Sequence, residues 1–201
     1  MTTATPEKLF EAEVKQADID HHTPTAGAMT GHIVANLEVL SNKLQMAKWY
    51  VKGMSAQQLK VLFGDLLKQA YDQKDALGTV LIDEALITPS TQKEFTEYTM
   101  LEENGQNKYE SVEWLVNDFV HDYDTENMFV TRAIKLAEKE DRPVLAQHLV
   151  GLLQDNNHNI ATLQALLGKT PREGLDEEDD EDQSSIDTRK KFRSNFTSEL
   201  F

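Results

Sequence analysis

Four long segments of the chain repeat apolar residues at intervals of three and four, and this periodicity constrains the fold more than any other feature. The segments cover residues 25–53, 55–85, 108–140 and 143–168. Such spacing puts the apolar side chains on one side of an α-helix, where a neighbouring helix can cover them. No segment alternates apolar and polar residues with period two, so no strands are expected. The pattern predicts an all-α protein built on a four-helix bundle.

Residues that start or stop helices mark the ends of these segments. Pro24 interrupts any helix that precedes the first segment. Gly53 ends the first segment, and Ser55 can cap the second. Pro143 suits the first turn of the fourth helix, and Gly168 suits its end.

The connection between the second and third helices carries a short helix of its own. The sequence Thr-Pro-Ser-Thr at residues 88–91 opens a segment, Gln92 to Met100, with the length of one or two helical turns. Asn104 and Gly105 then predict a turn. A short helix in the middle connection is expected where that connection crosses the bundle, so the sequence predicts the ferritin-like variant of the four-helix bundle.

The composition is strongly acidic, with 35 Asp and Glu against 20 Lys and Arg, a net charge of −15. Such a chain repels nucleic acid unless its positive charge is concentrated locally. The absence of cysteine excludes disulfides and thiolate sites. No apolar run approaches the roughly 20 residues that span a bilayer, and no secretion signal begins the chain. A cytoplasmic protein without a membrane partner is expected.

The chain divides into an N-terminal extension (1–24), the bundle (25–170) and a C-terminal tail (171–201). Residues 176–182 are seven consecutive acidic residues, which predicts a disordered, solvated segment. A basic patch follows at Arg189, Lys190, Lys191 and Arg193. Repeated on every subunit of an assembly, this patch could bind DNA phosphates by avidity. In the alternative interpretation, the acidic run binds the patch within the same chain and suppresses DNA binding.

Family resemblance appears at the end of the first predicted helix, which reads KLQMAKWYVKG over residues 43–53. This stretch resembles the end of the first long helix in the Dps family, the DNA-protecting mini-ferritins of starved bacteria. HHTPTAGAM over residues 21–29 is similar to the start of that helix in Dps proteins of lactic-acid bacteria, and ALLGK over residues 165–169 resembles the close of the fourth. The resemblance spans residues 20–172. It implies a dodecameric cage in the cytoplasm that can associate with the nucleoid.

The resemblance also implies a ferroxidase site shared by two subunits. One subunit gives a histidine before the tryptophan, a second histidine twelve residues later and an aspartate four residues further on. These positions fall on Lys48, Lys60 and Gly64. The partner gives an aspartate and a glutamate, which fall on Asp75 and Thr79. Only Asp75 keeps a ligand type, because a protonated lysine has no lone pair for iron. The sequence therefore predicts a degenerate site, weak iron binding, no firmly expected cofactor and no efficient ferroxidase activity.

The two lysines at these positions allow two interpretations. In the first, Lys48 and Lys60 replace iron as the positive partner of Asp75 on a neighbouring subunit and hold the interface in register. In the second, they are solvated surface lysines at a site that no longer binds metal.

Other histidines and aspartates could also serve as metal ligands. Asp20, His21 and His22 could hold a transition-metal ion before the first helix, or could be ordinary surface and cap residues. Two Asp-x-x-His pairs, Asp118/His121 and Asp155/His158, lie off the apolar stripes. They are predicted to be solvated.

The sequence is compatible with three functions. The first is a stress-protection cage that shields DNA or serves as a structural shell. The second is a mini-ferritin that oxidises and stores iron through carboxylates outside the family site. The third is a subunit that assembles with a ferroxidase-competent Dps paralogue.

Overall fold

The computed structural model describes residues 5–175, except for the side chains of residues 17, 18 and 20–22. The helices of this part are α1 (Pro6–His22), α2 (Ala26–Tyr50), α3 (Ala56–Asp83), α4 (Gln92–Tyr98), the 3₁₀ helix η1 (Gly105–Tyr109), α5 (Val112–Lys139) and α6 (Pro143–Leu166). No strand occurs among these residues. The all-α prediction is confirmed.

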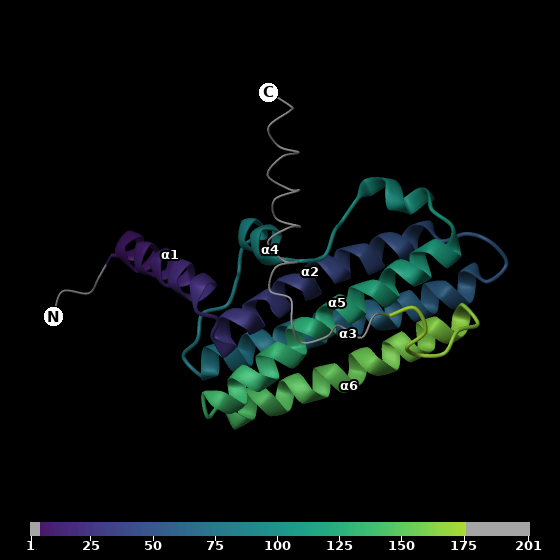
Figure 1. Cartoon of the computed structure of the whole chain (residues 1–201). Helices are drawn as coiled ribbons and strands as arrows, with labels where there is room; N and C mark the ends of the chain where they lie inside the picture. Colours follow the sequence, from purple (N-terminus) through teal and green to yellow (C-terminus); the bar gives the residue numbers. More distant parts are fainter. Residues whose placement is uncertain (1–4, 176–201) are drawn as a thin grey trace.

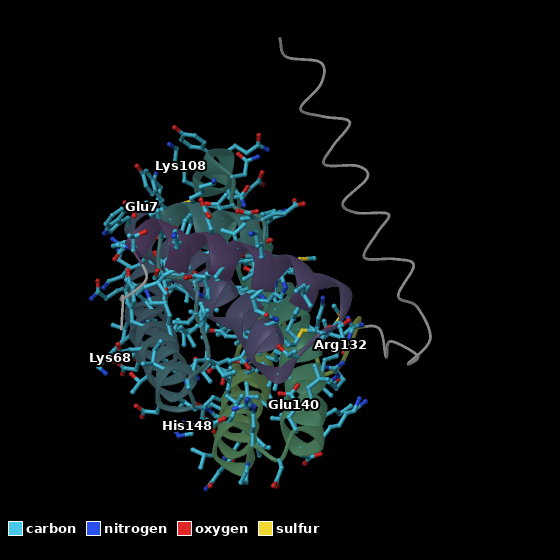
Figure 2. All side chains as sticks on the ribbon, turned by 90° about the vertical axis from the view of Figure 1, so that its left-hand side faces the viewer. Glu7, Lys68, Lys108, Arg132, Glu140 and His148 are labelled. Carbon is cyan, nitrogen blue, oxygen red and sulfur yellow. The ribbon has the colours of Figure 1, made fainter. Side chains whose placement is uncertain are left out.

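The four long helices α2, α3, α5 and α6 lie side by side and bury the predicted apolar stripes between them (Figure 1). Phe63 of α3 and Phe119 of α5 meet in this core with ring centroids 5.4 Å apart, and both are fully buried. Lys68 is an example of the polar outer surface: Figure 2 shows it near the outer edge of the molecule, and its side chain is exposed. The core is therefore the junction of four amphipathic helices.

The connection from α3 to α5 runs along α2 and carries α4 and η1, as a ferritin-like bundle requires (Figure 1). A capping box starts α4: the Thr91 side chain accepts from the backbone N–H of Glu94, and the Glu94 carboxylate accepts from that of Thr91. The third long helix begins at Val112 rather than at residue 108. The difference arises because residues 105–109 form a separate 3₁₀ turn and Ser111 caps α5.

Two ion pairs and one hydrogen bond join four helix ends at one end of the bundle. Arg142, before α6, contacts Glu84 at the end of α3 (3.0 Å) and Glu140 at the end of α5 (3.2 Å). The other carboxylate oxygen of Glu140 accepts from the backbone N–H of Ala26, the first residue of α2 (2.8 Å). The charges of Glu84 and Glu140 raise the pKa of Arg142 further, chiefly through the Glu84 hydrogen bond.

The two ends of the described chain differ in how they pack. At the C-terminal end, Leu175 is buried in the core, five residues beyond the predicted bundle boundary, and Arg172 contacts Asp124 at 2.8 Å. At the N-terminal end, α1 projects from the bundle and leaves Leu9 and Phe10 exposed (Figure 1). None of the helices within residues 5–175 has the length and apolar character that a membrane span needs.

Candidate functional site

Two of the positions singled out in the sequence, Lys48 and Gly64, touch across the α2–α3 hairpin. Lys48 lies in the last turn of α2 and is half-buried. Its Nζ atom lies 3.4 Å from the point where a Cβ atom on Gly64 would stand, and its Cε atom lies at 3.5 Å. The end of the lysine side chain therefore packs against the surface of α3 at Gly64.

Lys60 joins the same surface from the second turn of α3. It lies four residues before Gly64, so both residues lie on one side of the helix. Its side chain is exposed. We call Lys48, Lys60 and Gly64 the lysine face. Trp49 and Met54, close to it in the chain, are exposed by 68% and 103%, which gives this end of the hairpin an apolar and cationic character.

Asp75 and Thr79 lie further along α3 and line an open groove of about 380 Å³. We call this the acidic groove, because Asp83 lines it as well as Asp75. Both Asp75 and Thr79 are exposed. The Thr79 hydroxyl donates to the backbone carbonyl of Asp75 (2.9 Å), so it is already engaged within its own helix. The groove is completed by Val34, Lys74, Gly78, Ile82, Thr88, Pro89 and Phe95.

The lysine face and the acidic groove cannot meet within one chain. Lys60 and Asp75 are fifteen residues apart on one straight helix, which is about 22 Å at 1.5 Å per residue. The structure therefore brings Lys48, Lys60 and Gly64 together and keeps Asp75 and Thr79 apart from them. A combined site requires a second copy of the chain.

Lys74, beside Asp75, is committed to its own subunit. Its ammonium pairs with Glu38 of α2 and lies 4.8 Å from the centre of the Tyr71 ring. Burial raises the pKa of Glu38, but hydrogen bonds from Lys74 and Gln92 outweigh burial and leave that pKa below its ordinary value. Because Gln92 begins α4, this cluster also anchors the crossover helix beside the groove.

A buried ionic cluster that was not predicted from the sequence lies inside the bundle. Lys43 of α2 is 2% exposed and contacts Asp118 at 3.0 Å and Asp122 at 2.5 Å. The prediction that Asp118 is solvated is therefore only partly correct, because its side chain is 25% exposed but pairs with Lys43; His121, three residues later, is exposed.

The second Asp-x-x-His pair is likewise only half solvated. Asp155 accepts a hydrogen bond from Gln73 (3.0 Å), whereas His158 is exposed. In residues 5–175, leaving aside the side chains not described, no three imidazole or carboxylate groups gather in a way that could hold a metal ion.

Glu126, one turn beyond Asp122 on α5, is also fully buried. Its carboxylate accepts from the Asn36 amide (2.7 Å). Burial raises the pKa of Glu126 to about 8, against the opposing effect of that hydrogen bond. Burial likewise raises the pKa of Asp122 to about 7, although Lys43 opposes the shift. The available signal was the four-residue spacing of Asp118, Asp122 and Glu126, which repeats on one side of a helix.

Two predicted sites lie outside the described residues. These are the possible metal ligands Asp20, His21 and His22, whose side chains are not described, and the basic patch Arg189, Lys190, Lys191 and Arg193.

Comparison with known proteins places the fold. A model of the ferritin-like domain matches residues 30–173. The DpsB protein of Lactococcus lactis is 36% identical, with a TM-score of 0.78, and the match covers 82% of this chain and 95% of DpsB. The chain belongs to the Dps family. The DpsA protein of the same organism is 32% identical, with a TM-score of 0.80, over 84% of this chain and 99% of DpsA.

A curated relative supports the same assignment to the Dps family. The DNA protection during starvation protein of Listeria innocua is 29% identical over 142 residues, which are 71% of this chain and 91% of the relative. The Dps resemblance predicted from residues 43–53 is confirmed. All of α1, the first residues of α2 and the segment after residue 173 lie outside the ferritin-like match.

Proposed function

We propose that this Dps-family chain forms a protective cage that shields DNA or persists as a shell, and that it does not use the family ferroxidase positions to oxidise iron. The relatives named for DNA protection during starvation support the protective role. The observation that carries the second part is the Lys48 ammonium packed over Gly64.

The donor set at these positions does not fit iron. A protonated lysine offers three donors and no acceptor, and glycine offers no side chain. The Thr79 hydroxyl is engaged by its own backbone. Only Asp75 supplies a carboxylate, and in a site completed by a second copy a ferrous ion beside Asp75 would meet the like charges of that copy's two lysines. No oxidation step at these positions is therefore proposed.

The lysine face can instead pair with the acidic groove of a second copy. A two-fold contact would use each surface twice, because it is self-complementary. An antiparallel alignment of two α3 helices that sets Lys60 of one copy opposite Asp75 of the other also brings the exposed Met54 near Ile82. The ammonium groups then supply the positive charge that a metal ion would supply, and the apolar contact between Met54 and Ile82 lies beside them.

DNA binding is assigned to the basic patch at Arg189, Lys190, Lys191 and Arg193. Four cations per chain are few against a net charge of −15, so binding depends on many copies acting together. Because binding to phosphates releases counterions from the DNA, the affinity falls as the salt concentration rises.

A second candidate, iron storage, is favoured by a groove of about 500 Å³ between α3 and α6. It is lined by Asp65, Asp72 and Asp155. Carboxylates of this kind could nucleate iron on a cage wall without the family site, although Lys68 pairs with Asp72 there.

A third arrangement is assembly with an active paralogue. In that case the purified cage would contain a second Dps chain.

The protective role is tested with the purified full-length chain. Its mass by light scattering is expected to match a cage, and bound plasmid is expected to resist nuclease at low salt and lose that resistance at high salt. Replacing the four basic residues of the patch with glutamine is the matched variant. Equal protection of plasmid by both proteins would contradict DNA binding by the patch. A stable monomer would contradict assembly into a cage.

A further inference from the structure

The buried face of α5 carries more acidic side chains than the ammonium of Lys43 can neutralise. Asp118, Asp122 and Glu126 follow one another at four-residue intervals, and Lys43 pairs with the first two. Asp118 retains some contact with water, with a side chain 25% exposed. Asp122 and Glu126 are 7% and 0% exposed. One ammonium thus faces a partly solvated carboxylate and two buried carboxyl groups.

The hydrogen bonds around the two buried carboxyls are incomplete. One oxygen of Glu126 accepts from Asn36, while the other, Oε1, is buried without a hydrogen-bond partner. The Oδ2 atom of Asp122 lies 2.5 Å from Nζ of Lys43, an ammonium that Asp122 shares with Asp118. Ionised carboxylates in such surroundings lack the donors that water would supply, which favours a bound proton.

Asn36 connects this pair to the crossover segment. Its Nδ2 group donates to Glu126, and its Oδ1 atom accepts from the backbone N–H of Met100 (2.7 Å) and from the Thr99 hydroxyl (3.1 Å). One turn earlier on α2, His32 Nδ1 lies 2.7 Å from the carbonyl of Tyr98. The segment at the end of α4, in the middle of the crossover, is therefore held to α2 by two side chains, one of which also binds Glu126.

The charged groups that act on Asp122 come from α2 and α5. From α2 the charged neighbour is Lys43, and from α5 it is Asp118. The buried phenol of Tyr123, also on α5, has its pKa raised by burial and by Asp122 and Glu126. Asn159 of α6 forms hydrogen bonds with this phenol and with Gln69 of α3. The side chains of Asn159 and Gln69 are neutral amides. The crossover contributes the neutral Thr99.

We propose that Asp122 and Glu126 form a proton-binding site in the bundle core, and that release of its proton loosens the crossover segment at Asn36. On release, the carboxyl O–H bond breaks, the proton passes to a base in solution, and a carboxylate remains. That carboxylate needs more donors than the single amide of Asn36, so water must enter or Asn36 must shift. The raised pKa values of Asp122 and Glu126 agree with protonation near neutral pH.

Hydrogen exchange at Met100 and Leu101 tests the coupling in the assembled full chain. Protection factors, which remove the intrinsic effect of pH, are expected to fall about tenfold or more between about pH 6 and pH 9 in the native chain. Glu126→Gln mimics the protonated group and should abolish this fall. Glu113→Gln, at an exposed position on α5, should leave it unchanged. An equal fall in the native chain and Glu126→Gln would overturn the proposal.

Infrared titration of the native chain keeps the proposal testable even where Glu126→Gln does not fold. A carbonyl stretch of a protonated carboxylic acid is expected at pH 7, where ordinary Asp and Glu are ionised. It should disappear above about pH 9. Its absence at pH 7 would contradict a bound proton.

Discussion

The Lys48 ammonium lies over the α-carbon of Gly64, 3.4 Å from the point where a Cβ atom would stand. This contact joins the end of α2 to the middle of α3. It also shows that a positive charge occupies the surface where the family resemblance places a histidine and an aspartate. The remaining position with a ligand type, Asp75, lies too far along α3 to reach Lys48 in the same chain.

Asp75→Ala should weaken the contact between subunits. In the proposed interface this residue faces Lys60 of a second copy, and an exposed pair of this kind changes affinity by about 1.4-fold to fivefold. Dilution followed by light scattering or native mass spectrometry measures the effect. Asp72→Ala is the control, because Asp72 pairs with Lys68 of its own helix. Equal resistance to dilution by the native chain and Asp75→Ala would contradict the ammonium–carboxylate interface.

Lys43→Met should destabilise the bundle strongly. The substitution leaves Asp122 buried without its cation, and breaking a buried pair by removing one partner costs about 3–5 kcal/mol. Urea unfolding measures the loss. The double variant Lys43→Met with Asp122→Asn should recover much of it, since the uncompensated carboxylate is gone. A double variant no more stable than Lys43→Met would mean that packing, rather than charge, explains the loss.

The free energy of unfolding should fall as pH rises from about 5 to 8. In the folded chain the pKa of Glu126 is about 8 and that of Asp122 about 7, raised from ordinary values of 4.5 and 3.8. In this window the folded state holds protons that the unfolded state has released, so raising the pH favours unfolding. Each carboxyl contributes a slope of up to about 1.4 kcal/mol per pH unit. Urea midpoints across this range give the slope, and Glu126→Gln should reduce it. An unchanged slope in that variant would assign the dependence to other groups.

The fold was largely predictable because its determinants are local. Apolar spacing located all four long helices, and proline and glycine marked several of their ends. The start of α5 was misplaced because the polar residues 105–110 do not distinguish a 3₁₀ turn from the first turn of a longer helix.

The site was less accessible to sequence reasoning because its contacts join distant residues. The resemblance identified Lys48 and Gly64, but only the structure brings them into contact. The Lys43–Asp122 pair joins residues on different helices, so neither residue reveals its partner in the sequence. An aspartate beside an apolar stripe has the same pattern as a residue on the solvent-exposed side of the helix. The prediction for Asp118 was only partly correct for that reason.

The most direct test of the degenerate-site proposal is the initial rate of Fe(II) oxidation by peroxide in metal-free protein. A variant with Lys48→His, Lys60→His, Gly64→Asp and Thr79→Glu restores the family ligand types beside the native Asp75. The native chain should match buffer, and the restored variant should exceed it about tenfold or more, an advantage that Asp75→Ala should remove. Oxidation accelerated by the native chain and lost in its Asp75→Ala variant would contradict the proposal, because the native residues would then form a working iron site.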